Sequence, residues 1–434
     1  MLKEISKLLI YGDNGENSIL ENLAKLLNEA ENSASDKATL VKGIYREIKR
    51  LLDLATSYGF DRNLWQNYLT FIMITNENSF SLTAERASVS ENGTVNELVK
   101  NDFKVFKKLF HYDFSWVEKA LDINCFSLIT NYTAIPKREC VYNRSVSEKV
   151  KELSLKIDKA ADEKEVFEII TEHYEKYGVG LFGLNRAFRI EGSGENIKYL
   201  PINNADSVRL SDLVGYEYQK KLLVDNTETF VNGKKANNAL LYGDSGTGKS
   251  TSIKAVLNEY FPKGLRMIEI YRHQFKDLSF VIRDIKNRNY RFIIYIDDLS
   301  FEDNETEYKF LKAVIEGGVE TRPDNILIYA TSNRRHLIKE TWNDRNDMEF
   351  SGEVHRSDTV EEKLSLSARF GVLINYSAPS KQEFLNIVKT LAERENISIP
   401  EEELFLEANK WEMHHSGVSG RTARQFIDYL AGKQ

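Results

Sequence analysis

The chain has 434 residues, a formal net charge of −7, 41% hydrophobic residues and 29% charged residues. This is the balance of a soluble protein with a substantial core, and at about 150 residues per domain the length predicts two or three domains. No apolar stretch reaches the ~18 residues of a membrane span, and no lysine-rich arm indicates a nucleic-acid binder, although a local basic groove stays compatible with this composition.

The first residues do not resemble a secretory signal. The segment Met1 to Ile10 contains Lys3, Glu4 and Lys7 and lacks a continuous apolar core. We therefore expect a cytoplasmic protein without a membrane partner. The two cysteines are too few for a disulfide framework and too far apart for a pair of metal ligands.

Residues 1–177 predict a helical N-terminal domain. Apolar residues recur at helical spacing in three stretches, Ile19–Leu27, Leu40–Ala55 and Val95–Phe110. The charged pattern from Ser147 to Tyr177 also predicts helix, whereas the polar segment Asn76–Gly93 predicts a loop. Five glycines and Pro201 then mark residues 178–210 as a linker or a small β segment at the domain boundary.

Residues 211–378 alternate short β-type runs with helical patterns. The runs are Ala239–Tyr242, Arg266–Tyr271, Arg291–Ile296, Ile326–Ala330 and Phe370–Ile374. Strands separated by helices predict an α/β domain with a parallel sheet covered on both faces, and continuous apolar strands fit a sheet buried on both sides. Residues 379–434 predict a small helical lid.

A phosphate-binding loop follows the first of these strands. Its residues match G-x-x-x-x-G-K-[ST] and are Gly243, Asp244, Ser245, Gly246, Thr247, Gly248, Lys249 and Ser250. Glycines let the backbone wrap around phosphate, and the following helix adds its N-terminal dipole. We expect Lys249 in an exposed loop to contact the β- and γ-phosphates of ATP, and the Ser250 hydroxyl to bind Mg²⁺. Thr251 belongs to the same predicted nucleotide-binding set.

Two acidic residues end the third strand. Asp297 is the expected second Mg²⁺ ligand, and Asp298 is the expected group that orients and polarises the attacking water. Glu302 is the alternative for the second role, and the sequence leaves the choice open. The pair therefore predicts hydrolysis in addition to binding.

Three further polar residues follow the later strands. Asn333 ends the fourth strand at the edge of the sheet where ligands bind, and we expect it to position the water near the γ-phosphate. Arg369, just before the fifth strand, and Arg421, at the start of the last helix, are candidates to meet developing phosphate charge. A surface salt bridge is the alternative for each arginine.

At these residues, roughly from 205 to 434, the chain resembles the AAA+ ATPases (ATPases associated with diverse cellular activities). Gly243–Ser250 resembles Walker A, Ile293–Asp298 Walker B, and Asn333 sensor 1. The resemblance implies that Arg369 is an arginine finger acting on a neighbouring subunit's nucleotide, and that Arg421 is the sensor 2 arginine of the lid. It also implies that Val214 and Gly215 pack on the adenine.

The likeness is greater to an uncharacterised, mainly bacterial AAA+ family of ATP-binding proteins of unknown function. It is carried by Asp298–Glu302, Glu316–Glu320, Tyr329–Leu337 and the glycine-rich stretch Tyr177–Phe188. The chain departs from most AAA+ proteins at Asp298, where they have Glu, and at Ala368, where similar sequences often have a polar residue.

The resemblance implies an ATPase that remodels a protein or nucleoprotein partner and assembles as a homo-oligomer of hexamer type through the arginine finger. The alternative is a loader or switch gated by nucleotide, with little turnover. A third hypothesis, an unfoldase with a threading pore, is disfavoured because the segment Arg272–Asp277 has no glycine. The sequence identifies no client and leaves nucleic-acid binding open.

Overall fold

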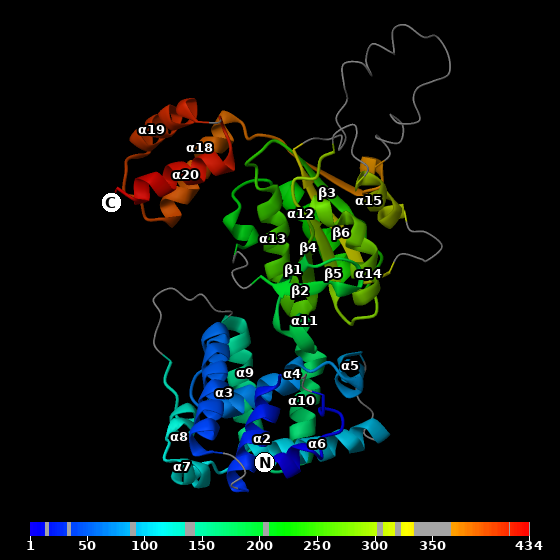
Figure 1. Cartoon of the computed structure of the whole chain (residues 1–434). Helices are drawn as coiled ribbons and strands as arrows, with labels where there is room; N and C mark the ends of the chain where they lie inside the picture. Colours follow the sequence, from blue (N-terminus) through cyan, green and yellow to red (C-terminus); the bar gives the residue numbers. More distant parts are fainter. Residues whose placement is uncertain are drawn as a thin grey trace. The chain divides into compact units, whose positions relative to one another are not determined.

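A computed structural model describes residues 1–13, 17–32, 36–86, 93–134, 144–202, 208–301, 307–316, 323–333, 366–415 and 417–433 (Figure 1). The chain forms two compact units. The helical unit comprises Met1–Asn185 and Pro201–Asn204, and the sheet unit comprises Arg186–Leu200 and Ala205–Gln434. Within the described ranges, no helix combines the length and the apolar character needed to cross a membrane.

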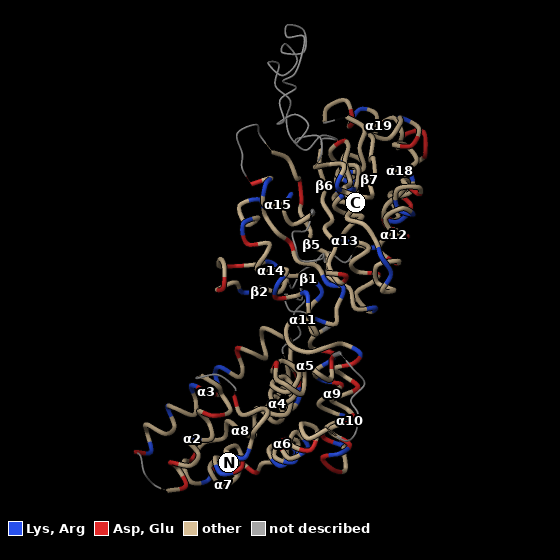
Figure 2. Tube along the Cα trace, turned by 90° about the vertical axis from the view of Figure 1, so that its right-hand side faces the viewer, with Lys and Arg blue, Asp and Glu red and all other residues tan. Residues whose placement is uncertain are grey.

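The helical unit is built around one aromatic core. Trp65, Phe80, Phe103 and Phe106 are all at most 1% exposed, and Tyr11 lies edge-on to Phe106 with 5.5 Å between ring centroids. Figure 2 shows acidic and basic residues interspersed along the helices α2 (Ile19–Glu31) and α3 (Lys37–Tyr58). The helices are α1 (Leu2–Ile5), α2 (Ile19–Glu31), α3 (Lys37–Tyr58), α4 (Leu64–Thr75), α5 (Ser79–Arg86), α6 (Thr94–Phe110), α7 (Ser115–Leu121), α8 (Cys125–Thr130), α9 (Arg144–Lys159), α10 (Glu163–Tyr177) and α11 (Gly180–Leu184).

Helix α5 corrects the expectation of a loop over the first part of Asn76–Gly93, while residues 87–92 lie outside the described residues. Two features of this polar sequence favour a helix. The Asn78 side chain accepts hydrogen bonds from the Phe80 and Ser81 amides, which caps the helix start. The Phe80 ring lies 5.4 Å from that of Phe167, so one buried aromatic residue anchors a mostly polar helix.

Seven strands form one sheet in the order β2-β1-β4-β5-β6-β3-β7. The pairs β1–β4, β4–β5, β5–β6, β6–β3 and β3–β7 are all parallel. The strands are β1 (Ala187–Glu191), β2 (Lys198–Pro201), β3 (Ala239–Gly243), β4 (Leu265–Glu269), β5 (Arg291–Ile296), β6 (Ile326–Ser332) and β7 (Val372–Tyr376). All seven residues of β6 are buried, as expected for a central parallel strand. The predicted α/β P-loop NTPase fold is therefore confirmed.

Helices cover both faces of this sheet. Figure 1 shows α12 and α13 on one side and α14 and α15 on the other, the arrangement that right-handed crossovers produce. Beyond β7, α18, α19 and α20 pack around Phe384, Leu404 and Phe426 as a small separate core. The bounds are η1 (Gly194–Asn196), η2 (Leu210–Asp212), α12 (Glu217–Val231), α13 (Lys249–Tyr260), η3 (Phe261–Lys263), η4 (Arg272–Asp277), α14 (Leu278–Ile285), α15 (Glu307–Glu316), α18 (Lys381–Arg394), α19 (Glu401–His414) and α20 (Gly420–Ala431).

The strand order brings three chemically distinct segments to one edge of the sheet. β6 lies between β3 and β5, so the ends of these three strands are neighbours. The phosphate-binding loop follows β3, Asp297 and Asp298 follow β5, and Asn333 follows β6. Ligands bind at the carboxyl ends of parallel strands in such sheets, so this edge is the candidate ligand-binding site.

Candidate active site

The loop after β3 requires glycine because other segments approach its backbone closely. Gly248 has φ +93°, and a Cβ atom there would lie 2.7 Å from Cδ2 of Leu213. Gly246 has φ +76°, and its Cβ would meet Oγ of Ser419 at 3.0 Å. Both backbone angles lie in the left-handed region that glycine adopts without strain. The loop leads directly into α13, which begins at Lys249.

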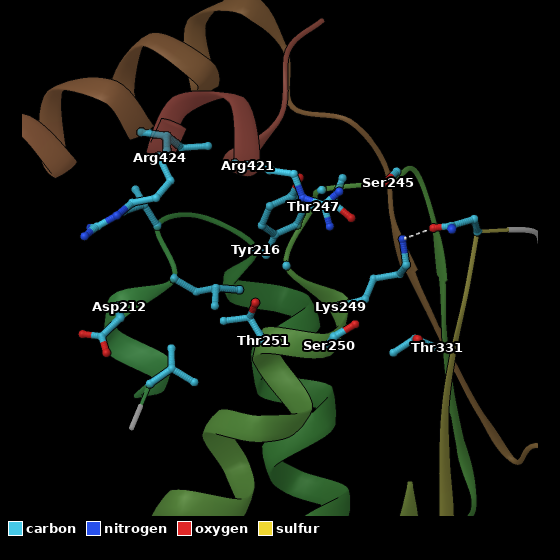
Figure 3. A pocket seen from close by; sticks show the side chains of 18 of the residues that line it. Asp212, Tyr216, Ser245, Thr247, Lys249, Ser250, Thr251, Thr331, Arg421 and Arg424 are labelled. Atoms are coloured by element: carbon cyan, nitrogen blue, oxygen red, sulfur yellow. Dashed lines mark hydrogen bonds between the residues drawn. The ribbon is translucent and has the colours of Figure 1, made fainter. Parts of the chain in front are cut away.

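Lys249 is buried in this loop, with only 7% of the residue exposed. Its ammonium group donates to the carbonyl oxygens of Gly243 at 2.8 Å and Asp244 at 2.6 Å. It also donates to Oδ1 of Asn333 at 3.0 Å, the dashed bond in Figure 3. Burial lowers the pKa of Lys249 below its usual 10.5. The loop has exposed residues at Asp244 and Ser245, but Lys249 itself is buried because the loop folds its own carbonyl groups around the charge.

Ser250 and Asp297 form a pair of oxygen ligands at the start of α13. The Ser250 hydroxyl donates to Oδ1 of Asp297 at 2.8 Å. Burial raises the pKa of Asp297, but the hydrogen bonds from Thr331 and Ser250 are among the interactions that lower it more, so the net pKa lies below 3.8. The carboxylate is thus ionised at neutral pH. A hydroxyl and a carboxylate are hard ligands that suit Mg²⁺ bound jointly with phosphate oxygens.

Asp298 has an unusual backbone conformation for a residue with a side chain, with φ +50°. Its amide donates to the Thr331 hydroxyl at 2.9 Å. Its carboxylate Oδ1 accepts a hydrogen bond from Nδ2 of Asn333 at 2.9 Å. Left-handed backbones of this kind persist where the surroundings over-determine them, which is common at active sites. Glu302, the alternative carboxylate, lies outside the described residues.

These groups line one cavity of about 900 Å³ (Figure 3). Its lining combines the loop, both acids and Asn333 with a set of apolar side chains. The volume and this mixture of polar and apolar groups fit a nucleotide with a base and a phosphate chain. The apolar wall is formed by Val208, Leu213, Val214, Tyr216, Ile387 and Leu391.

The lid contributes two arginines to the same cavity. Figure 3 shows Arg421 and Arg424 extending from the lid above the loop. The backbone amide of Arg421 donates to the Gly246 carbonyl at 3.1 Å, so the start of α20 touches the phosphate-binding loop directly. Arg424 also forms ion pairs with Glu395 at 2.8 Å and Asp428 at 3.0 Å. Arg421 is therefore the better placed of the two to meet a phosphate.

The structure brings most of the predicted site residues together. Those that line the cavity are Ser245, Gly246, Thr247, Gly248, Lys249, Ser250, Thr251, Val214, Asp297, Asp298, Asn333 and Arg421. Among the described residues, Gly243, Asp244, Gly215 and Arg369 are not part of the lining. Asp244 instead accepts a hydrogen bond from the Ala378 amide at 2.6 Å, at the connection between β7 and the lid.

A sequence model described as "Protein of unknown function (DUF815)" matches residues 184–434, more than half of the chain. The chain belongs to the DUF815 family. This confirms the expectation that the chain belongs to an uncharacterised family. No curated protein matches the DUF815 chain.

Three solved structures of RuvB from Thermotoga maritima resemble the DUF815 chain. An alanine-to-serine variant has 16% sequence identity to the chain and a TM-score of 0.34. A proline-to-glycine variant has 17% sequence identity and a TM-score of 0.35. The RuvB Holliday junction branch migration motor has 14% and 0.31. Each match covers 51% of this chain. The matched part is 63% of the alanine-to-serine variant, 64% of the proline-to-glycine variant and 71% of the branch migration motor. The DUF815 chain thus spans less than two thirds of the first two, and the chemistry of its site has to be inferred from its own residues.

Thr331, Asp212 and Arg424 line the DUF815 cavity but had no role assigned from the sequence. Thr331 is the most informative omission, because its hydroxyl contacts Asp297 at 2.6 Å as well as the Asp298 amide. Its place two residues before Asn333, near the end of the same strand, was the available signal. Asp212 lies in η2, where no sequence pattern indicates a site.

Proposed function

We propose that this protein binds Mg-ATP in the cavity of the sheet unit and hydrolyses it. The observation that carries the proposal is the convergence of Lys249, the Ser250–Asp297 pair and the Asn333–Asp298 pair in one cavity. Each group matches one need of phosphoryl transfer: charge on the phosphates, oxygen ligands for Mg²⁺, and an oriented water.

The residues divide the work as follows. Lys249 and the loop amides hold the phosphates, and Ser250 and Asp297 hold Mg²⁺, which when bound neutralises phosphate charge. Asp298 orients the attacking water and accepts its proton, while Asn333 fixes the Asp298 carboxylate. Arg421 approaches the phosphates from the lid. Val214 packs on the adenine, and Gly215, next to it but outside the described cavity lining, belongs to the same adenine-binding segment.

Arg369 is assigned to a different site, the nucleotide of a neighbouring subunit. Its absence from the described cavity lining is what a finger acting in trans requires. Such a finger needs head-to-tail contacts between subunits, which close into a ring. The assembly proposed here is a homo-oligomer of hexamer type that forms with ATP.

The helical N-terminal part is proposed as the adaptor for a protein or nucleoprotein client. We keep the division into domains 1–177, 178–210, 211–378 and 379–434 as part of this proposal. ATP turnover in the sheet unit would then drive remodelling of the client. Capture of a client is best attempted with Asp298→Asn, which is expected to bind ATP without hydrolysing it.

The second candidate is a loader or switch gated by nucleotide, with little turnover. It is favoured by one feature, the short carboxylate of Asp298 where most AAA+ proteins have Glu. Steady-state turnover by the full chain separates the two. Phosphate release that is fast and lost in Asp298→Asn supports the ATPase, whereas saturable ATP binding with negligible phosphate release in the wild type supports the switch.

A further inference from the structure

Thr331 lies between the phosphate-binding strand and the strand that carries the acids. On one side it pairs with Leu241 of β3. On the other side, Ala330 pairs with Ile296 of β5. The residues that follow these two in the chain, Thr331 and Asp297, therefore lie beside each other. Thr331 is only 2% exposed, so water does not compete for its hydroxyl.

The Thr331 hydroxyl makes two hydrogen bonds whose directions are fixed by chemistry. The Asp298 amide has a proton and no lone pair, so it donates to Oγ1 across 2.9 Å. The single hydroxyl proton is then available for Oδ1 of Asp297 at 2.6 Å. One oxygen atom therefore joins the backbone of one acid to the carboxylate of the other.

The backbone of Thr331 completes the attachment. The Leu299 amide donates to the Thr331 carbonyl at 2.7 Å. Asp298 is thus held by bonds at its own amide, at the next amide and at its side chain, which together fix its left-handed backbone with φ +50°. Two of these three bonds end on Thr331.

We propose that Thr331 is a positioning residue that sets both acids at once: it aligns Asp297 toward Mg²⁺ and holds Asp298 in the backbone conformation that points its carboxylate at Asn333. This inference rests on the proposed function of the same cavity. It assigns to Thr331, which lies outside Gly243–Ser250 and Ile293–Asp298, a role that neither Walker motif contains.

The test compares Thr331→Val, which removes the hydroxyl and keeps the shape, with Thr331→Ser, which keeps the hydroxyl. Thr227→Val is a matched control. The Thr227 hydroxyl is fully buried and bonds to the Leu223 carbonyl at 2.7 Å and the Tyr329 hydroxyl at 2.9 Å, away from the acids. Thermal unfolding of each variant establishes that it is folded, and Thr331→Ala replaces Thr331→Val if the latter is not.

The first readout is the Mg²⁺ concentration that half-saturates binding of an ATP analogue with an imido bridge between its β- and γ-phosphates. The second is the split of turnover into kcat and KM. Loss of a residue that orients a metal ligand costs about 10–100-fold in metal affinity or activity. We therefore expect Thr331→Val to need about 10–100-fold more Mg²⁺ and to have a lower kcat. Binding without Mg²⁺ should not change, and Thr331→Ser should recover most of the loss.

Three results would overturn this inference: an unchanged Mg²⁺ requirement in Thr331→Val, an equal loss in Thr331→Ser, or an equal loss in Thr227→Val. Failure of the proposed function has a different signature. If the wild type releases no phosphate, hydrolysis is wrong, while the Mg²⁺ requirement for analogue binding still decides the role of Thr331.

Discussion

The Asn333 side chain donates a hydrogen bond from Nδ2 to Oδ1 of Asp298 across 2.9 Å. Its other end, Oδ1, accepts from the Lys249 ammonium at 3.0 Å. The charges on either side fix the orientation of this amide, because a flipped amide would set oxygen against carboxylate and nitrogen against ammonium. Asn333 therefore links the group that holds phosphate to the proposed group that orients water.

Replacing Asn333 with Ala should lower turnover far more than nucleotide affinity. The variant keeps Lys249 and the loop but leaves the Asp298 carboxylate without its positioning donor. Loss of one preorganised donor typically costs about 10²–10³-fold in kcat. Steady-state phosphate release and equilibrium binding on the same preparation measure the two effects, and an equal fall in both would contradict the role given to Asn333.

Asp298→Asn should bind ATP and turn it over about 10²–10⁴-fold more slowly than the wild type, the usual cost of losing a general base. An amide of the same size keeps the hydrogen-bonding shape but cannot take a proton from water. Glu302→Gln is the matched comparison. If Glu302→Gln is slow and Asp298→Asn is not, the catalytic carboxylate is Glu302.

The pH dependence of nucleotide binding should report the ionisation of Lys249. Burial lowers its pKa below 10.5 in the free protein, and the phosphates of a bound nucleotide favour its charged form. Affinity is thus complete below that lowered pKa and falls as the pH rises through it, so the fall begins below pH 10.5. Titrations over the alkaline range measure it.

Lys249→Arg is the control for this pH effect. Arginine stays charged across the same range, so a variant that still binds should lose the alkaline fall. If wild type and Lys249→Arg lose affinity in parallel, a group other than Lys249 is responsible.

Arg369 should complement an intact P-loop on another subunit. Lys249→Ala and Arg369→Ala are each expected to be inactive, but a mixture forms some interfaces in which an intact loop faces an intact finger. Activity should therefore reappear on mixing, and Arg369→Ala alone should lose turnover more than affinity. A mixture that co-assembles and stays inactive, or full activity of the wild type as a dilute monomer, contradicts the finger in trans.

The sequence predicted the elements whose signals are local. The five β-type runs correspond to β3, β4, β5, β6 and β7, because strands buried on both faces are continuously apolar. The contacts of Thr331 with both acids could not be predicted, because they depend on the register that pairs Ile296 with Ala330 across two strands. The burial of Lys249 was missed for a similar reason: it arises from how the loop folds back on itself.

The charge pattern predicted helix over Ser147–Tyr177 but did not predict that this stretch is divided into two helices. The stretch Ser147–Tyr177 is helical as predicted, but it forms the separate helices α9 and α10. The break is set by Asp162, whose carboxylate accepts from the Lys164 and Glu165 amides and so starts α10. A capping aspartate within a charged run looks like any other acidic residue in the sequence.

The most direct test of the central claim, that Mg-ATP binds at Lys249, is calorimetric titration of ATP with Mg²⁺ into wild type and Lys249→Ala. Because Lys249 also bonds to two loop carbonyls, circular dichroism and thermal unfolding must first establish that the variant is folded. We predict saturable binding to the wild type and no measurable binding to Lys249→Ala. A folded Lys249→Ala that binds ATP with unchanged affinity, or a folded wild type that binds none, would contradict the claim.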